Sequence, residues 1–401
     1  MKKVIAILVA LVFALAAFAC YDWAEVGSLL GITEPDKYYG FAKDENGTTE
    51  FYSAEEINNF EFTLDKYSSK VYFEKLNDRE KVIYKAFLYA VQESYPCVFF
   101  DKRATEGNTY SPSDILSILS LSSPLIEQNL HGSSQDCGFN VGMISRLINH
   151  ETYAGTRYMF DSFNEENLAK KNEAIAAAEK FLAEVGTDYK DKKALAKAIY
   201  EKFVKESKYV KYENATDYHD HLYDAIIKHE SQCDGFANAL SLLYNMAGID
   251  CFEKIYEPED ESEGHTWNCI LIENEYYNVD ATCDPRTAAE REAFEIFPAG
   301  FGFTDSLQAF AHGYADILPA STAGNLFGSQ KIDMKSKSAA TNKIAEIYKK
   351  SGNMFAVTYS DAADKTVISV LQGVCDKLRV GMNYETYTGQ SEKLLVIYKD
   401  K

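Results

Sequence analysis

Residues 231–246, SQCDGFANALSLLYNM, place a cysteine directly before an amphipathic run. The apolar side chains of this run, Phe236 and Leu240 among them, recur at the spacing of one helix face. We therefore predict a helix over 233–246 with Cys233 at its N-terminus. The positive end of the helix dipole favours a thiolate at that position, and the thiolate is the form of cysteine that attacks carbonyl carbon.

A single cysteine in a helix is more often an inert buried residue than a nucleophile. Two later stretches change this interpretation, because 264–268 reads GHTWN and 276–282 reads YYNVDAT. They supply His265 and Asp280 as candidate partners for Cys233. An imidazole can take the proton of a thiol, and a carboxylate can orient the imidazole.

Together the three stretches resemble the transglutaminase-like superfamily, whose members carry Cys-x-Gly-aromatic-Ala, then His-x-Trp-Asn, then aromatic-Tyr-x-Val-Asp-x-Thr. The resemblance covers residues 170–285 and implies a papain-like thiol-enzyme core. It implies that Cys233 is the nucleophile, His265 the base and acid, and Asp280 the residue that orients the imidazole. The sequence departs from the family pattern at Cys283, where a tryptophan commonly follows the Asp-x-Thr run.

The function expected from this resemblance is attack of Cys233 on a protein or peptide amide, through a thioacyl intermediate. Water as acceptor gives hydrolysis and an amine gives transamidation; hydrolysis is favoured because no sequence feature marks an amine site. Two alternatives stay open. One is a non-catalytic cell-surface module that binds peptide or glycan on the same fold. The other is an adhesion or scaffold protein, since 21–165 and 301–401 carry no motif.

Strand alternation tests whether His265 and Asp280 can meet. If Asn274 and Glu275 form a two-residue turn, residues whose numbers add to 549 lie opposite each other, and the two side chains share one face. In that register Asp280 lies four residues from the position opposite His265, roughly 13 Å along the ladder. A bulge, a strong twist or another turn must close this gap. Trp267 is expected to be a cleft or core aromatic that holds the same strand.

The element order predicts an α+β fold, in which a helix bundle carrying the cysteine packs on an antiparallel sheet carrying the histidine and aspartate. The predicted helices are 79–95, 111–121, 165–185, 191–209, 224–230, 233–246, 341–350 and 365–378, and the predicted strands are 96–101, 265–272, 276–280, 355–359, 383–388 and 393–398. The predicted domains are a signal peptide (1–19), a helix-rich region (20–165), a transglutaminase-like catalytic domain (166–300) and an α+β region (301–401).

Residues 1–19 have the pattern of a bacterial export signal. Two lysines at 2 and 3 precede an apolar stretch over 4–16, and residues 17–19 read Ala-Phe-Ala, a small-x-small cleavage site. Cys20 follows directly, and both a lipid anchor on Cys20 and free secretion stay open. We expect an exported protein, secreted or held at the cell surface, which contacts the membrane only through such an anchor.

The formal net charge of −20 at pH 7 repels phosphate backbones, so nucleic acid is not an expected partner. A protein or peptide substrate is the expected partner, and no cofactor or metal is expected. The acidic run 257–263 lacks the pattern of a calcium loop, and the sequence DYHDH at 217–221 lacks a third spaced ligand. Both are expected to be polar loops.

Eight cysteines in an exported protein suggest disulfides. With Cys20 and Cys233 set aside, the six that could form three bridges are Cys97, Cys137, Cys251, Cys269, Cys283 and Cys375. Their connectivity does not follow from the sequence. For Cys251 and Cys269, three interpretations stay open: core thiols, a disulfide with each other, or redox partners of Cys233.

Overall fold

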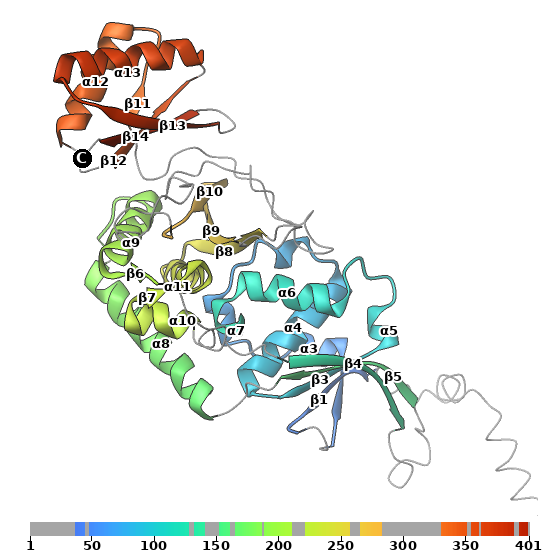
Figure 1. The fold of residues 1–401 in the computed structure, drawn as a ribbon. Helices are drawn as coiled ribbons and strands as arrows, with labels where there is room; N and C mark the ends of the chain where they lie inside the picture. Colours follow the sequence, from blue (N-terminus) through green and yellow to red (C-terminus); the bar gives the residue numbers. More distant parts are fainter. Residues whose placement is uncertain are drawn as a thin grey trace, which may run out of the picture.

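The computed structural model describes residues 37–44, 48–127, 132–140, 152–160, 165–186, 188–210, 221–256, 265–282, 330–350, 354–360, 362–388 and 393–399. The predicted signal peptide, Cys20, the acidic run 257–263 and Cys283 lie outside the described residues, as does 217–220. Two hydrophobic cores organise the described chain, one formed by residues between Tyr39 and Ala281 and the other by residues between Ile332 and Ile397. Figure 1 shows the arrangement of the elements.

The first part of the chain contains an antiparallel five-stranded sheet of order β2-β1-β3-β5-β4. Its strands are β1 (Lys37–Ala42), β2 (Glu50–Ser53), β3 (Cys97–Asp101), β4 (Gly132–Asn140) and β5 (Thr152–Phe160). The prediction that 20–165 is helix-rich therefore missed four of its five strands. The reason is that short apolar runs such as KYYGFA show no period-2 alternation, and that β4 is mostly small and polar.

The helices of this part are α3 (Ala54–Asn58), α4 (Asp78–Glu93), α5 (Lys102–Thr105), α6 (Pro112–Ser122) and α7 (Pro124–Glu127), with short 3₁₀ turns η1 (Leu64–Tyr67) and η2 (Phe73–Lys75). The predictions at 79–95 and 111–121 are confirmed by α4 and α6. Both helices begin with a capping box, Asn77 with Glu80 and Ser111 with Asp114, which satisfies backbone N–H groups that the first turn leaves open.

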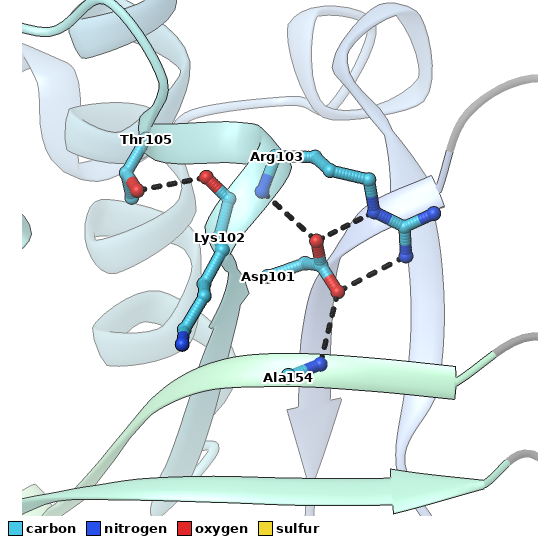
Figure 2. A network of polar contacts seen from close by, with 5 residues as sticks. All are labelled: Asp101, Lys102, Arg103, Thr105 and Ala154. Atoms are coloured by element: carbon cyan, nitrogen blue, oxygen red, sulfur yellow. Dashed lines mark hydrogen bonds and ion pairs between the residues drawn. The ribbon is translucent and has the colours of Figure 1, made fainter.

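An ion pair between Asp101 and Arg103 lies where β3 ends (Figure 2). The buried carboxylate of Asp101 accepts from Nε of Arg103 at 2.7 Å and from the backbone N–H of Ala154 at 3.3 Å. The guanidinium of Arg103 also lies over the ring of Tyr38, 4.5 Å from its centroid. Burial acts to raise the pKa of Asp101, but the hydrogen bonds and charge of Arg103 outweigh it and hold the pKa below its usual range.

We expect Asp101→Asn to destabilise the protein by about 2 kcal/mol at pH 7, because a buried charge-assisted hydrogen bond is lost. The pKa of Asp101 is lower in the folded than in the unfolded state, so its contribution is fully present above the unfolded value, about 4, and disappears as the pH falls through the folded pKa. Urea unfolding of both proteins at pH 7 and pH 3 measures this. An equal difference at both pH values would show that packing, not charge, is responsible.

The middle of the chain combines helices with a second antiparallel sheet of order β10-β9-β8. Its elements are α8 (Glu165–Val185), α9 (Lys192–Glu206), α10 (His221–Tyr223), the π-helical turn η4 (Asp224–Lys228), α11 (Cys233–Met246), β8 (Asp250–Tyr256), β9 (His265–Ile272) and β10 (Glu275–Val279), with a short parallel pair β6 (Lys208–Tyr209) and β7 (Glu230–Ser231). Helix α11 lies against β8 and β9 (Figure 1), and the predicted α+β core is confirmed.

The first sheet region and the middle region share a single core. The ring of Tyr72 packs edge-on against Phe252 of β8, with centroids 4.8 Å apart, and its hydroxyl donates to the backbone oxygen of Glu253 at 2.9 Å. Ser69 also donates to the carboxylate of Asp250, at the start of β8. Residues before position 127 therefore support the sheet that carries His265.

The last part of the chain has its own core and an order of elements close to the prediction. It contains β11 (Gln330–Ile332), α12 (Lys337–Lys350), β12 (Met354–Tyr359), α13 (Asp364–Leu378), β13 (Met382–Thr388) and β14 (Lys393–Lys399). The sheet order is β11-β12-β14-β13, and α12 and α13 lie on one side of it (Figure 1). Among the described helices of the whole chain, none is both long and apolar enough to cross a bilayer.

Candidate active site

A tight hairpin joins β9 to β10, and its turn residues are Glu273 and Asn274, with φ of 55° and 64°. A two-residue turn of type I′ needs positive φ at both positions. Opposite residues therefore add to 547, with Asn268 facing Val279, and the predicted turn at 274–275 is wrong by one residue. The physical reason is that Asn274 tolerates the left-handed region at either turn position, so its presence does not decide whether Glu273 or Glu275 shares the turn with it.

The corrected register brings the predicted pair together. The ladder ends at the pair of Asn268 and Val279, and in its register continued toward His265 the opposite position is residue 282 instead of 284, on the face that Asp280 shares with His265 as predicted. Nε2 of His265 lies 2.7 Å from Oδ2 of Asp280, and the two side chains are 18% and 12% exposed. Because an ionised carboxylate only accepts, Nε2 carries the proton, and Nδ1 is the basic nitrogen of the neutral ring.

The carboxylate of Asp280 is held on both oxygens. Oδ1 accepts from the backbone N–H of Thr282 at 2.9 Å, while Oδ2 faces the imidazole. The backbone oxygen of Asp280 also accepts from the hydroxyl of Tyr200 on α9, at 3.3 Å. These contacts fix the carboxylate and thereby the ring that it orients.

Trp267 fixes the imidazole from a second direction. It lies two residues after His265 on the same face of β9, and the two rings stack with centroids 5.9 Å apart and planes 17° apart. Trp267 is buried. The expectation that it holds the histidine strand is therefore consistent with the structure.

Cys233 is the first residue of α11, as predicted, and its side chain is partly exposed. The helix is entered from Gln232, whose backbone oxygen accepts from Phe236, and the N–H of Gly235 is satisfied by Asp234 at 2.8 Å. Near the thiol, the first turn of the helix presents backbone N–H groups of the kind that can bind an oxyanion.

Hydrogen bonds between α11 and the sheet give the direction of the helix. The side chain of Asn268 on β9 donates to the backbone oxygen of Ala237 at 2.8 Å. Two turns further on, Asn245 exchanges two hydrogen bonds of 2.9 Å with the backbone of Cys251, which lies opposite Ile270. Residue numbers therefore increase in the same direction along α11 and along β9.

The consequence is that the first residues of both elements lie at the same end. Cys233 begins α11 and His265 begins β9, where Asp280 meets the imidazole. The structure thus places the start of the cysteine helix at the same end of the sheet as the pair of His265 and Asp280. The hydrogen bond joins His265 to Asp280 directly, while Cys233 is placed by the helix.

The cysteines correct one expectation. In the described part of the chain, Cys97, Cys233, Cys251, Cys269 and Cys375 are thiols without a disulfide, so the three-bridge framework is wrong. Cys251 and Cys269 are both fully buried, which favours the interpretation as core thiols. A free thiol packs like a small apolar side chain and is only a weak hydrogen-bond donor, so it can be buried with few polar partners.

Burial raises the pKa of Cys251 well above its ordinary value. The thiolate fraction of Cys251 is therefore small at neutral pH, and we expect no iodoacetamide labelling of this residue in the native protein. Mass spectrometry after labelling with and without 6 M guanidinium measures this. Labelling of native Cys251 at the rate seen in guanidinium would contradict the buried position.

Sequence reasoning missed four residues of the site. Asn268 and Thr282 stand within the motif stretches, so their positions carried a signal that was not used. Tyr200 lies on α9, outside any motif, and Ser241 follows the Cys-x-Gly-aromatic-Ala pattern on α11; their hydrogen bonds to Asp280 and Asn268 form only in the folded chain. Among the described residues, no three His, Cys, Asp or Glu side chains gather as a metal site would require.

Comparison with known families agrees with this geometry. Residues 177–281 match the family model described as the transglutaminase-like superfamily, which covers about a quarter of the chain. This segment, which contains α11 and the hairpin of His265, is therefore a transglutaminase-like domain with the fold of a thiol enzyme. No curated protein matches the sequence.

Solved structures give more distant likenesses. The periplasmic domain of TgpA from Pseudomonas aeruginosa bound to ethylmercury is 18% identical, with 35% of this chain and 59% of that chain covered and a TM-score of 0.23. A second structure of that domain is 16% identical, with 38% and 65% covered and a TM-score of 0.24. A structure described as a TGase is 10% identical, with 51% and 52% covered and a TM-score of 0.26. The chain spans less than two thirds of each of these chains.

Proposed function

We propose that the protein is an extracytoplasmic thiol enzyme that acts on amide bonds of proteins or peptides, with Cys233 as nucleophile. The observation that supports this most directly is the 2.7 Å contact between His265 and Asp280 at the end of the sheet where the cysteine helix begins. A carboxylate that holds Nε2 leaves Nδ1 as the proton acceptor for a thiol.

The first half-reaction forms a thioester. His265 takes the proton of Cys233, and the thiolate attacks the amide carbonyl to give a tetrahedral oxyanion, which N–H groups of the first turn of α11 would bind. As the carbonyl re-forms, the C–N bond breaks and the imidazolium delivers its proton to the departing amine. Asp280 stays ionised throughout and stabilises the imidazolium.

The second half-reaction regenerates the thiol. Water, deprotonated by His265, attacks the thioester carbonyl, the C–S bond breaks, and the proton returns to Cys233. An amine in place of water would give transamidation by the same steps. We assign hydrolysis as the main reaction, because water needs no second substrate site.

Export is part of the same proposal. Its support is the pattern of residues 1–19, with two lysines, an apolar stretch and a small-x-small site before Cys20. The strongly negative charge of the chain suits a soluble protein outside the cytoplasmic membrane and disfavours nucleic acid as a partner. The substrate class proposed is a polypeptide.

The first test is the reactivity of Cys233. At about pH 6 an ordinary thiol is almost fully protonated, so we expect Cys233 to be alkylated by iodoacetamide at least 10-fold faster than Cys375, which is also partly exposed. The His265→Ala variant should lose this advantage, because the imidazolium that stabilises the thiolate is absent. Site-resolved mass spectrometry gives both rates. Equal rates for the two thiols would argue for the binding-module alternative.

The second test is turnover. With casein as probe, release of peptides reports hydrolysis and incorporation of a fluorescent primary amine reports transamidation. Cys233→Ala should abolish both signals, and Asp280→Asn should lower kcat on the order of 10³-fold, because the imidazole loses the charge that orients it and stabilises its cation. Asp280→Asn with full turnover would refute the role assigned to the carboxylate.

A further inference from the structure

A buried polar contact joins the cysteine helix to the histidine strand. The amide nitrogen of Asn268, on β9, donates to the backbone oxygen of Ala237 at 2.8 Å and to the hydroxyl of Ser241 at 3.0 Å. Asn268 is only 1% exposed. A buried amide nitrogen without partners costs free energy, so these two acceptors tie Asn268 to one turn of α11.

This contact lies close to the proposed nucleophile along the helix. Ala237 follows Cys233 by four residues, about 6 Å along the helix axis. On the other side of the contact, His265 precedes Asn268 by three residues in a strand whose pairing with β8 has no bulge. The histidine is fixed to the sheet by Asp280, so the helix is the remaining element that must be placed.

We propose that Asn268 is a positioning residue that sets the distance between the thiol of Cys233 and the imidazole of His265. The proposal rests on the function proposed above. Asn268 acts by holding the first turns of α11 against β9. Ser241 shares this task as the second acceptor, and it also lies 3.6 Å from the sulfur of Cys251.

The chain contains a matched control. Asn245 lies on the same helix and also makes two hydrogen bonds to the sheet, both of 2.9 Å, with the backbone of Cys251. Asn245 is twelve residues from Cys233, about 18 Å along the helix axis. Leucine has nearly the shape of asparagine and no polar group, so Asn268→Leu removes the contact at Ala237 and Ser241, and Asn245→Leu removes a contact of two hydrogen bonds at the last turn of α11.

The experiment measures the rate of Cys233 alkylation by iodoacetamide between pH 4 and pH 9 in the full chain. We expect Asn268→Leu to lower the rate at pH 6 at least 10-fold and to move the midpoint of the profile to higher pH, because a displaced imidazole stabilises the thiolate less. Asn245→Leu should lower Tm to a similar extent and leave the profile in place.

Ser241→Ala provides a second variant that removes one acceptor with little change in shape. It should shift the profile in the same direction by a smaller amount, and it serves where Asn268→Leu does not fold. A profile for Asn268→Leu and Ser241→Ala that coincides with the unsubstituted protein, or an equal shift in Asn245→Leu, would overturn the positioning role. If the unsubstituted protein itself labels Cys233 like an ordinary thiol, the proposed function fails instead, and the two failures are distinct.

Discussion

Burial of helix α11 on all sides is the constraint on which the rest of the site depends. Its residues are buried without interruption from Gly235 to Tyr244. Water is excluded from a helix enclosed in this way, so a polar side chain on it gains from a hydrogen-bond partner inside the core. Asn268 supplies a donor to Ser241 for this reason, and the same contact holds the helix in one position along the sheet.

The enclosed helix leaves the core at its two ends, where Cys233 and Asp234 on one side and Asn245 and Met246 on the other are partly exposed. Cys233 is partly exposed, whereas the helix below it is packed between α8, α9 and the sheet. A thiol at such an edge combines access from solvent with a rigid support. Cys251, on the same core but away from the edge, has no such access, and burial raises the pKa of its thiol well above the ordinary value. Position in the fold thus separates two cysteines that are chemically identical.

The sheet is held in turn by the first part of the chain. Tyr72 and Ser69 bond to β8, which pairs with β9 and so supports His265 from the side away from β10. The region before position 127 is therefore part of the platform of the site. A large change in this region is expected to act on the site through β8, since both belong to one hydrophobic core.

The sequence by itself determined the local features. The apolar spacing of 233–246 and the alternation of 265–272 gave α11 and β9 with their observed ends, and the three motif stretches gave the residues of the candidate site. These features were predictable because helix and strand periods, caps and motif order are encoded by neighbours in the chain. The turn was placed one residue too late because a positive φ at Glu273 has no side-chain signal.

Only the tertiary structure decided the rest. The five-stranded sheet near the N-terminus pairs residues that are far apart in sequence, such as Phe41 and Val98. A short apolar run does not indicate which other strand it will pair with. The state of Cys251 and Cys269 as buried thiols, and the contacts of Asn268 and Tyr200, likewise arise between segments far apart in sequence. The physical reason is that burial and hydrogen-bond partners depend on how all the segments pack together. The sequence pattern of one segment indicates only which secondary structure that segment favours by itself.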